Sequence, residues 1–565
     1  MSKILSNIII TLIVLAIIKI SGAQTIKFVD PFVKLNFETQ QNIEKNAEVS
    51  ELIVYPGETV DFQIVLQVMK GKVSIITEKT ETDFVQPSFY LQLNFRTTKK
   101  RSDDRPVYPD ILFPLPSISR NEFLIDIQNQ QVKSRVNLSY LALWVDLKIA
   151  EKAVEGKFPV NFIFKIDNLE EMRKTILLNV QKSLKLKEVD FAIDYNEYGD
   201  KYIDSKTKNK GLKLLREMEN KYYKFIDQHK GTLNVLPYKS QSGKSREGMT
   251  PELEGEGKEK HIKNWHLFEE RYSGYLNGNV FESGKPIRHF YLPFNPNWPA
   301  SFDLYFTDRK KYEDEWQAVA EDFIRYFKEK NWNQTIFQVY MNQKPNDKNK
   351  IPWNLDEPKG LEDYLGLQYY SDLFERAFQN AAPLQIQFRM DISHFYCDEH
   401  IGSIRKDFRV NKGKEKLKKV DIWTISNHSL KSETAIQKAQ QLKKAGKEVW
   451  HYGITPQLED SPLKIYELVF NDWFYGFTGI MLWKTLNRKL DSGSGKDFIF
   501  YKGNKFGLNE PLASIRMKHL RDAKTDLKFL QELDVDSQKD LEKILNSGSR
   551  YEMRKNLIER LHGGN

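Results

Sequence analysis

The sequence predicts a multidomain protein, with an N-terminal antiparallel β-sandwich followed by a (β/α)8 barrel of the TIM type and C-terminal helices. Three observations favour this architecture. Residues 24–186 contain short runs of β-branched and aromatic residues, separated by turn formers such as Pro56-Gly57. From residue 187 onward, short apolar segments alternate with stretches of helical periodicity. The chain of 565 residues is also long enough for two or three hydrophobic cores.

Residues 1–23 have the features of a signal peptide. Lys3 gives a basic start, Ile8 to Ile18 is apolar, and Ser21-Gly22-Ala23 supplies small residues for cleavage before Gln24. The apolar run is shorter than the roughly 20 residues that span a bilayer. An uncleaved anchor is the alternative. We therefore expect a periplasmic or secreted protein that is not inserted in the membrane after cleavage.

The segment 24–186 is expected to form the β-sandwich domain. Apolar residues occupy the even positions of Val60 to Leu66, whereas Asp61 and Gln63 lie on the other face. This alternation is typical of a half-buried antiparallel strand. The other runs interpreted as strands are Leu52–Tyr55, Phe89–Phe95 and Phe158–Phe164. One sandwich accounts for all of them.

The segment 187–565 is expected to form the barrel domain, including its closing helices. Eight strands are predicted: Val189–Ile193, Leu233–Pro237, His289–Pro293, Ile336–Met341, Leu384–Ile392, Val420–Ile425, Glu448–Tyr452 and Gly479–Trp483. Helical stretches such as Glu313–Lys328 separate them, which favours a barrel. An open doubly wound sheet is the competitor, but no glycine-rich phosphate loop follows any strand.

Three further segments complete the predicted barrel domain. Ser240 to Lys260 is polar and rich in glycine and glutamate, and we expect it to be a mobile loop. A helix opened by Pro511 is expected to close the barrel, and Ser547 to Leu561 is expected to be a last amphipathic helix.

The composition excludes several classes of protein. The net charge is +9, but the basic residues are spread among 77 acidic ones, so no nucleic-acid partner is expected. The single cysteine, Cys397, cannot form an internal disulfide. The histidines and acids between His394 and His400 fit no zinc-site spacing. We predict no metal or cofactor, and the sequence does not indicate an oligomeric state.

Two adjacent carboxylates follow the fourth predicted barrel strand, in Asp356-Glu357-Pro358. Barrel enzymes carry their reacting groups at such strand ends. Neighbouring residues on a regular strand point to opposite faces. Pro358 is expected to bias Glu357 toward an extended conformation and to bend the chain, so that both acids reach one pocket. Taken alone, the tripeptide is more typical of a helix start than of a catalytic pair.

Matches in order along the chain give these acids a context. The segments concerned are Gly57–Gln63, Tyr108–Pro114, Trp144–Asp146, Glu155–Phe158, Phe337–Lys344, Asp356–Pro358, Phe388–Ser393, Asp421–Trp423, Ser514–Arg516 and Leu520–Asp522, with Asp526 beyond. Together they resemble glycoside hydrolase family 123 and the wider group that shares its C-terminal catalytic domain. Glu155, Ala523 and Leu527 depart from the group's usual Pro, Gly and Tyr.

The resemblance implies a retaining, exo-acting hydrolase of terminal β-linked N-acetylhexosamine, with N-acetylgalactosamine favoured. Glu357 would be the general acid and then the base that activates water. Asp356 would orient the substrate's 2-acetamido group, whose carbonyl oxygen attacks the anomeric carbon to form an oxazoline. We expect the neighbouring Asp anion to raise the proton affinity of Glu357, as an acid working near neutral pH requires.

Other polar and aromatic residues at the predicted strand ends are candidates for binding a carbohydrate. They are Asn196, Tyr198, Trp298, Asn342, Asp391, Trp423, Tyr452 and Trp483. Each also has a structural interpretation. The tryptophans could fill the barrel or pack a loop, the asparagines could cap turns, and Asp391 could pair with Arg389 on the same strand face.

Two alternatives to this activity stay open. The polar stretch Gln343 to Asn354 before the acids favours a glycosidase acting on a different glycan, without acetamido participation. The barrel could also be a carbohydrate-binding protein without turnover, although both acids are present.

Overall fold

The computed structural model describes residues 25–563, apart from 37–38, 40–42, 45–46, 68–71, 79–82, 97–106, 120, 127–139, 167–170, 183–185, 199–211, 241, 247, 346–349, 394–418, 431–432, 488–497, 534 and 536. The predicted signal peptide and the cluster at 394–400 lie outside the described residues. The chain divides into two compact units. The first comprises Met1–Arg96, Pro106–Lys185 and Asn546–Asn565, and the second comprises Thr97–Arg105 and Leu186–Leu545.

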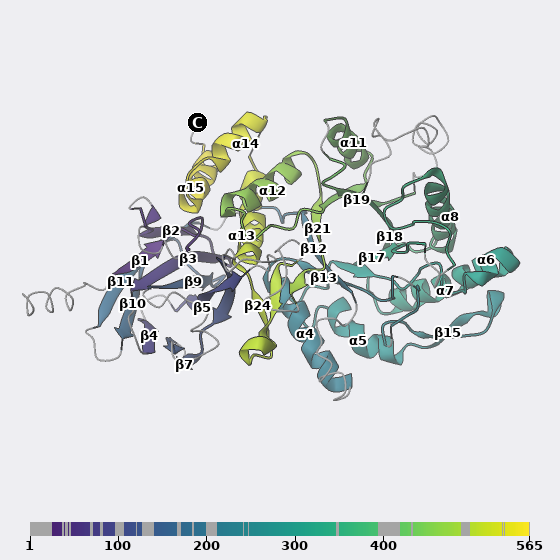
Figure 1. Ribbon diagram of the computed structural model, residues 1–565, viewed down its shortest axis with the longest axis horizontal. Helices are drawn as coiled ribbons and strands as arrows, with labels where there is room; N and C mark the ends of the chain where they lie inside the picture. The colour runs from purple at the N-terminus through teal and green to yellow at the C-terminus, as the bar shows by residue number, and fades with distance from the viewer. Residues whose placement is uncertain are drawn as a thin grey trace, which may run out of the picture. The chain divides into compact units, whose positions relative to one another are not determined.

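Two β-sheets form most of the first unit (Figure 1). In order across the sheet, one contains β1 (Ile26–Val29), β3 (Thr59–Gln67), β9 (Tyr140–Ile149), β5 (Val85–Arg96) and β6 (Val107–Pro114). The other contains β2 (Glu51–Val54), β11 (Met172–Val180), β10 (Gly156–Ile166), β4 (Lys72–Thr77), β8 (Glu122–Asp126) and β7 (Ser117–Ser119). All pairs are antiparallel except β2 with β11, so the predicted antiparallel pattern holds away from that edge.

Aromatic side chains from the two sheets contact one another. Phe162 of β10 lies 5.5 Å from Phe28, 5.9 Å from Phe62 and 6.0 Å from Phe89, measured between ring centroids. All four rings are buried. These contacts between facing sheets are those that a β-sandwich requires.

The last helix, α15 (Arg550–Leu561), belongs to the first unit, whereas we had assigned it to the barrel domain. Arg550 Nη1 lies 2.8 Å from Asp61 Oδ1, and Arg554 pairs with Glu58. Asp61 is therefore buried, and its face of β3 is not the solvated one that the alternating pattern predicts. The ion pair between Arg550 and Asp61, which lie 489 positions apart in the sequence, determines where this helix packs.

The eight predicted barrel strands form one parallel sheet in the second unit. Its order is β13 (Thr232–Leu236), β12 (Ala192–Tyr198), β21 (Gly479–Trp483), β20 (Glu448–Tyr452), β19 (Ile422–Ser426), β18 (Gln385–Ile392), β17 (Ile336–Tyr340) and β16 (His289–Tyr291). The two end strands approach each other, since the Tyr291 amide donates to Asn234 Oδ1 at 3.2 Å. The sheet is thus a nearly closed barrel.

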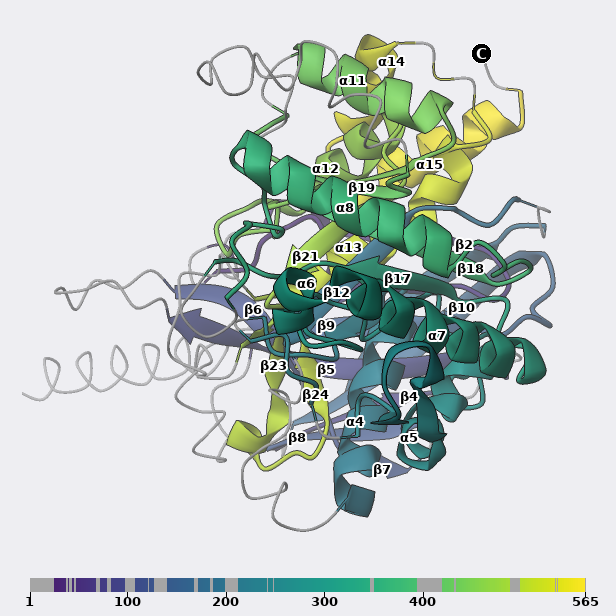
Figure 2. The same cartoon turned by 90° about the vertical axis from the view of Figure 1, so that its right-hand side faces the viewer.

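Helices follow most of these strands. They are α4 (Leu212–Gln228), α5 (His266–Leu276), α6 (Asp303–Thr307), α7 (Arg309–Glu329), α8 (Leu361–Ala377), α11 (Glu433–Lys444) and α12 (Pro462–Phe474). Helices α7 and α8 lie side by side next to β17 and β18 (Figures 1 and 2). No helix in the described part of the chain is long and apolar enough to cross a membrane.

Two expected segments differ from the prediction. The segment 240–260 contains β14 (Glu252–Glu254), which pairs with β15 (His261–Asn264) around a 3-10 helix, Gly257–Glu259. Pro511 begins a short strand, β24 (Pro511–Ala513), in a small sheet with β22 (Leu486–Asn487) and β23 (Phe500–Lys502). The 3-10 helix Gly503–Phe506 joins β23 to β24. The closing helix, α13 (Ile515–Leu530), begins after Ser514, whose side chain caps it, and α14 (Gln538–Leu545) follows.

Candidate active site

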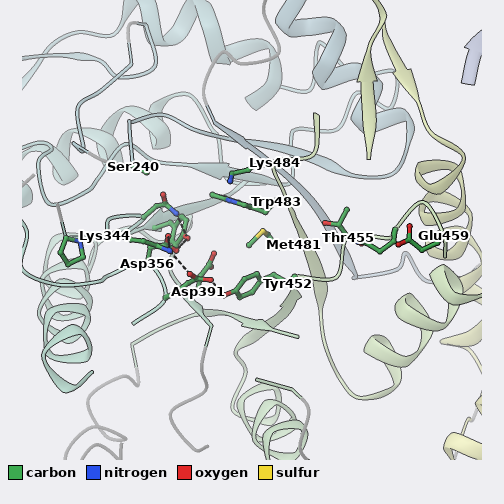
Figure 3. A pocket seen from close by; sticks show the side chains of 16 residues that line it. Ser240, Lys344, Asp356, Asp391, Tyr452, Thr455, Glu459, Met481, Trp483 and Lys484 are labelled. Carbon is green, nitrogen blue, oxygen red and sulfur yellow. Dashed lines mark hydrogen bonds and ion pairs between the residues drawn. The ribbon is translucent and has the colours of Figure 1, made fainter. Parts of the chain in front are cut away.

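A cavity of about 890 Å³ opens at the carboxyl ends of β17, β18, β20 and β21 (Figure 3). This volume is within the range of small-molecule sites. The residues that line it are Ser240, Tyr340, Asn342, Lys344, Pro345, Asp356, Glu357, Asp391, Tyr452, Gly453, Thr455, Gln457, Glu459, Met481, Trp483 and Lys484. The site therefore lies at the barrel end where parallel strands present their loops.

Asp356 and Glu357 reach this cavity because the chain returns to the end of β17. The backbone amides of Leu355 and Asp356 both donate to the carbonyl oxygen of Gln343, at 2.9 and 3.0 Å. Asn354 Nδ2 donates to the carbonyl oxygen of Glu357 at 2.6 Å. These bonds close the loop that leaves after β17 and fix the acidic pair beside the strand end.

The acidic pair does not cap a helix. Helix α8 begins at Leu361, and the Asp363 carboxylate accepts from the amides of Lys359 and Gly360 at 2.9 and 3.1 Å. Asp363 thus binds the amides that directly precede α8, including that of the N-cap residue Gly360. The side chains of Asp356 and Glu357 are left to face the cavity, so the helix-start interpretation does not describe their role.

The backbone of Glu357 differs from the extended conformation that Pro358 led us to expect. Its φ is +61°, in the left-handed region that residues with a Cβ seldom adopt. This conformation is what turns consecutive carboxylates toward one cavity, since an extended pair would point to opposite sides.

Asp356 is largely buried, with its side chain 15% exposed. Tyr340 Oη donates to Oδ1 at 2.8 Å, and the Lys344 ammonium lies 3.3 Å from Oδ2. Asn342 Nδ2 donates in turn to Tyr340 Oη at 2.8 Å. Burial raises the pKa of Asp356 to about 6, against the opposing effect of Lys344.

Glu357 is held by two donors. Tyr452 Oη donates to Oε1 at 2.6 Å, and Lys344 Nζ donates to Oε2 at 2.8 Å. Burial acts to raise its pKa, but these two hydrogen bonds together with the charges of Lys344 and Lys359 outweigh burial and leave the pKa below the ordinary glutamate value. The expectation of a raised proton affinity for Glu357 is therefore wrong, because Lys344 lies between the two carboxylates.

Beneath the cavity, Arg389 and Asp391 of β18 form the ion pair that their shared strand face allows. Arg389 Nε donates to Asp391 Oδ1 at 2.8 Å, and Nη2 donates to Oδ2 at 3.1 Å. Arg389 also lies 3.3 Å from Asp194 Oδ2. Asp391 lines the cavity, so this pair links the barrel interior to the site.

The structure brings together six of the ten residues that the sequence singled out. Asp356, Glu357, Asn342, Asp391, Tyr452 and Trp483 all line the cavity. Tyr452 does so while its neighbour His451 points away, with Nδ1 at 2.9 Å from Asp472 Oδ1. This alternation is the one that a strand imposes.

Three of the other four do not line the cavity. Trp298 packs on Phe294 and Phe323, and Trp423 donates its Nε1–H to the Val420 carbonyl at 3.2 Å. Asn196 is fully buried and donates to Asp194 Oδ2 at 2.6 Å. For these three the packing interpretation fits. The side chain of Tyr198 lies outside the described residues.

Two lysines in the cavity were not identified from the sequence. Lys344 comes two residues after Asn342, and Lys484 follows β21 directly with a φ of +54°. Lys344 ends the matching segment Phe337–Lys344, and the only sequence signal of Lys484 is its position after a strand end. Figure 3 shows Lys344 beside Asp356, whereas Lys484 lies with Trp483 on another part of the wall. Within the described residues, no group of three or more histidine, cysteine or acidic side chains is arranged to hold a metal ion.

The sequence matches no protein-family model and no curated protein. Its fold is similar to that of a family 123 glycoside hydrolase from Clostridium perfringens, described for glycolipid glycan hydrolysis. The TM-score is 0.61 with 13% identity, over 96% of this chain and 97% of that chain. A family 5 xyloglucanase from Bacteroides ovatus covers 84% of this chain and 98% of its own, with 7% identity and a TM-score of only 0.31. The first similarity is one of fold along nearly the whole chain.

Proposed function

We propose that this protein is a retaining, exo-acting glycoside hydrolase that releases terminal β-linked N-acetylhexosamine, with N-acetylgalactosamine preferred. The observation that carries the proposal is that Asp356 and Glu357 face one cavity and lie within 3.3 Å of a single nitrogen, Lys344 Nζ. The similarity of fold to a family 123 glycoside hydrolase supports it. Tyr452 and Trp483 supply aromatic wall against which a sugar ring can pack.

In the proposed mechanism Glu357 is the general acid. Its proton passes to the glycosidic oxygen as the bond from that oxygen to the anomeric carbon breaks. The acetamido carbonyl oxygen of the same sugar attacks the anomeric carbon and forms an oxazoline, so the enzyme supplies no nucleophile. Asp356 accepts the acetamido N–H and stabilises the positive charge that develops on this group. Glu357 then takes a proton from water, which opens the oxazoline with net retention.

Hydrolysis of three aryl glycosides by purified residues 24–565 tests the proposal. Aryl β-N-acetylgalactosaminide and β-N-acetylglucosaminide are expected to be cleaved, the first faster, whereas aryl β-galactoside is not. Asp356→Asn is expected to abolish turnover, because the acetamido group loses the negative charge that stabilises it. Equal turnover of the β-galactoside would count against acetamido participation.

A second candidate is a glycosidase that acts on a glycan without an acetamido group. The observation that favours it is Lys344, which places an ammonium ion against Asp356, where the acetamido N–H would bind. A thiazoline analogue of the oxazoline separates the two candidates. Competitive inhibition by this analogue supports acetamido participation, and its absence together with cleavage of another glycan supports the second candidate.

We also propose that the protein is exported, on the basis of the pattern in residues 1–23. Expression of the full chain in a Gram-negative host, followed by sequencing of the periplasmic and secreted protein, tests this. A mature N-terminus at Gln24 is expected. Protein that keeps residues 1–23 in the membrane fraction would indicate an uncleaved anchor instead.

A further inference from the structure

Lys344 is the most exposed of the three charged groups at the reacting centre. Its side chain is 53% exposed, compared with 28% for Glu357 and 15% for Asp356. Tyr340 and Tyr452 hold the two carboxylates from the ends of β17 and β20. Among the described residues, Lys344 is the one cation within 4 Å of both carboxylates.

The hydrogen bonds of Glu357 conflict with its proposed role as an acid. Oε1 accepts from Tyr452 and Oε2 accepts from Lys344, so both oxygens act as acceptors. A carboxylic acid must carry its proton on one of these oxygens and direct it at the leaving group. One donor must therefore move away before the reaction. Tyr452 is fixed on a strand, whereas Lys344 is on a loop and reaches solvent.

We propose that Lys344 is a positioning residue. Its hydrogen bond to Oε2 of Glu357 breaks when substrate binds, so that Oε2 faces the substrate's glycosidic oxygen, while Lys344 remains paired with Oδ2 of Asp356. This inference rests on the proposed function. Glu357 takes up one proton from solvent as Lys344 leaves, and this proton is the one passed to the leaving group. Asp356, still paired with the ammonium ion, stays ionised to accept the acetamido N–H.

Other charges surround the pair but do not bridge it. Lys359 acts at longer range to lower the pKa of Glu357, and Asp391 acts to raise that of Asp356. Arg389 lies behind Asp391, and Lys484 and Glu459 line other parts of the cavity. Removing the Lys344 charge is therefore expected to raise the pKa of both carboxylates.

The experiment is the pH profile of kcat/KM for an aryl β-N-acetylhexosaminide, measured for wild type, Lys344→Met, Lys344→Arg and Lys350→Met. Lys350 is a matched control, because it is an exposed lysine of the same loop that pairs with Asp303 at 3.0 Å. In Lys344→Met the profile is expected to move up by about one pH unit, with both kcat and KM lowered. KM falls because no ion pair has to be displaced. Lys344→Arg is expected to keep the wild-type profile, and so is Lys350→Met.

A purely structural role would lower kcat/KM at every pH without moving the profile, and that result would overturn the inference. If Lys344→Met were too slow for a profile, 13C NMR titration of the Glu357 carboxyl carbon, assigned with Glu357→Gln, replaces it. An unchanged midpoint between wild type and Lys344→Met would overturn the inference as well. Wild-type protein that cleaves no aryl hexosaminide would instead refute the proposed function.

Discussion

Tyr452 Oη donates a 2.6 Å hydrogen bond to Oε1 of Glu357, which joins the end of β20 to the loop that returns after β17. A hydrogen bond from a neutral donor to an ionised acceptor is both shorter and stronger than one between neutral groups. It therefore stabilises the anion of Glu357 and fixes the direction of its side chain within the cavity.

Tyr452→Phe is expected to lower kcat/KM by about tenfold, because Glu357 loses the contact that orients it. The pKa of Glu357 should rise when a donor to its anion is removed, so the optimum should also move to higher pH. The pH profile of kcat/KM measures both effects. Tyr475→Phe, which removes a hydroxyl bonded to Gln538 far from the cavity lining, is the control and should leave the profile unchanged.

Glu357→Gln is expected to lower kcat/KM by about 10²- to 10⁴-fold, which is the usual contribution of a general acid. The amide still accepts from Tyr452 but cannot transfer a proton to the leaving oxygen. Initial rates on an aryl β-N-acetylgalactosaminide provide the measurement. Glu362→Gln, on an exposed position in the first turn of α8, should keep wild-type rates. Full activity of Glu357→Gln would reject the assignment of this residue as the acid.

The sequence predicted seven of the eight barrel strands to within two residues at each end and misplaced the first. Glu448–Tyr452 and Gly479–Trp483 have the bounds expected of them. The first strand was expected at Val189–Ile193 and lies at Ala192–Tyr198. The shift arises because Asp194 and Asn196 are buried, with Asp194 near Arg389 of a distant strand. The hydropathy of a segment does not reveal that its charged side chain is buried against an opposite charge on a distant strand.

The position of a residue at a strand end identified Asp356, Asp391 and Tyr452 as neighbours in space. The same rule failed for Trp423. The position of a residue near a strand end does not tell whether its side chain points into the barrel or away from it. The role of Lys344 depends on the return of the loop to Gln343, which is a three-dimensional contact. The packing of α15 depends likewise on the ion pair between Arg550 and Asp61.

Asp356→Asn is expected to stabilise the fold at neutral pH. Burial raises the pKa of Asp356 from 3.8 to about 6, so the folded state binds a proton more tightly than the unfolded state. The stability that this group contributes is present below pH 4 and is lost as the pH rises through about 6. At pH 7 the variant should therefore be more stable than wild type by about 3 kcal/mol.

Chemical denaturation at pH 4 and pH 7 measures this difference. The gain from Asp356→Asn should be present at pH 7 and small at pH 4. Asp303→Asn, at an exposed carboxylate, is the control and should show no such dependence on pH. A gain of the same size at both pH values would mean that burial of the charge is not its cause.

Arg389→Met is expected to destabilise the barrel by about 3–5 kcal/mol, because it leaves buried carboxylates without their cation. Arg389 is fully buried, bonds Asp391 through two nitrogens and lies 3.3 Å from Asp194. Urea denaturation gives the free energy of unfolding. Adding Asp194→Asn and Asp391→Asn to this variant should restore part of the loss. A single variant within about 1 kcal/mol of wild type would contradict this account.

The left-handed backbone of Glu357 predicts an inverted preference between glycine and alanine. Both Glu357→Gly and Glu357→Ala remove the carboxylate and its bonds to Tyr452 and Lys344, so they differ only in the backbone. At a φ of +61° a Cβ costs about 1–2 kcal/mol, so the glycine variant should be the more stable by about 1 kcal/mol. Glu321, exposed in the middle of α7, supplies the opposite control, since glycine there should be less stable than alanine by about 1 kcal/mol. Thermal or urea unfolding of the four variants measures both differences.

Neither variant at 357 should hydrolyse glycosides, so a more stable glycine variant would mean that strain at Glu357 is maintained for the direction of its carboxylate. An alanine variant as stable as glycine at this position would show that the turn toward the cavity carries no such strain.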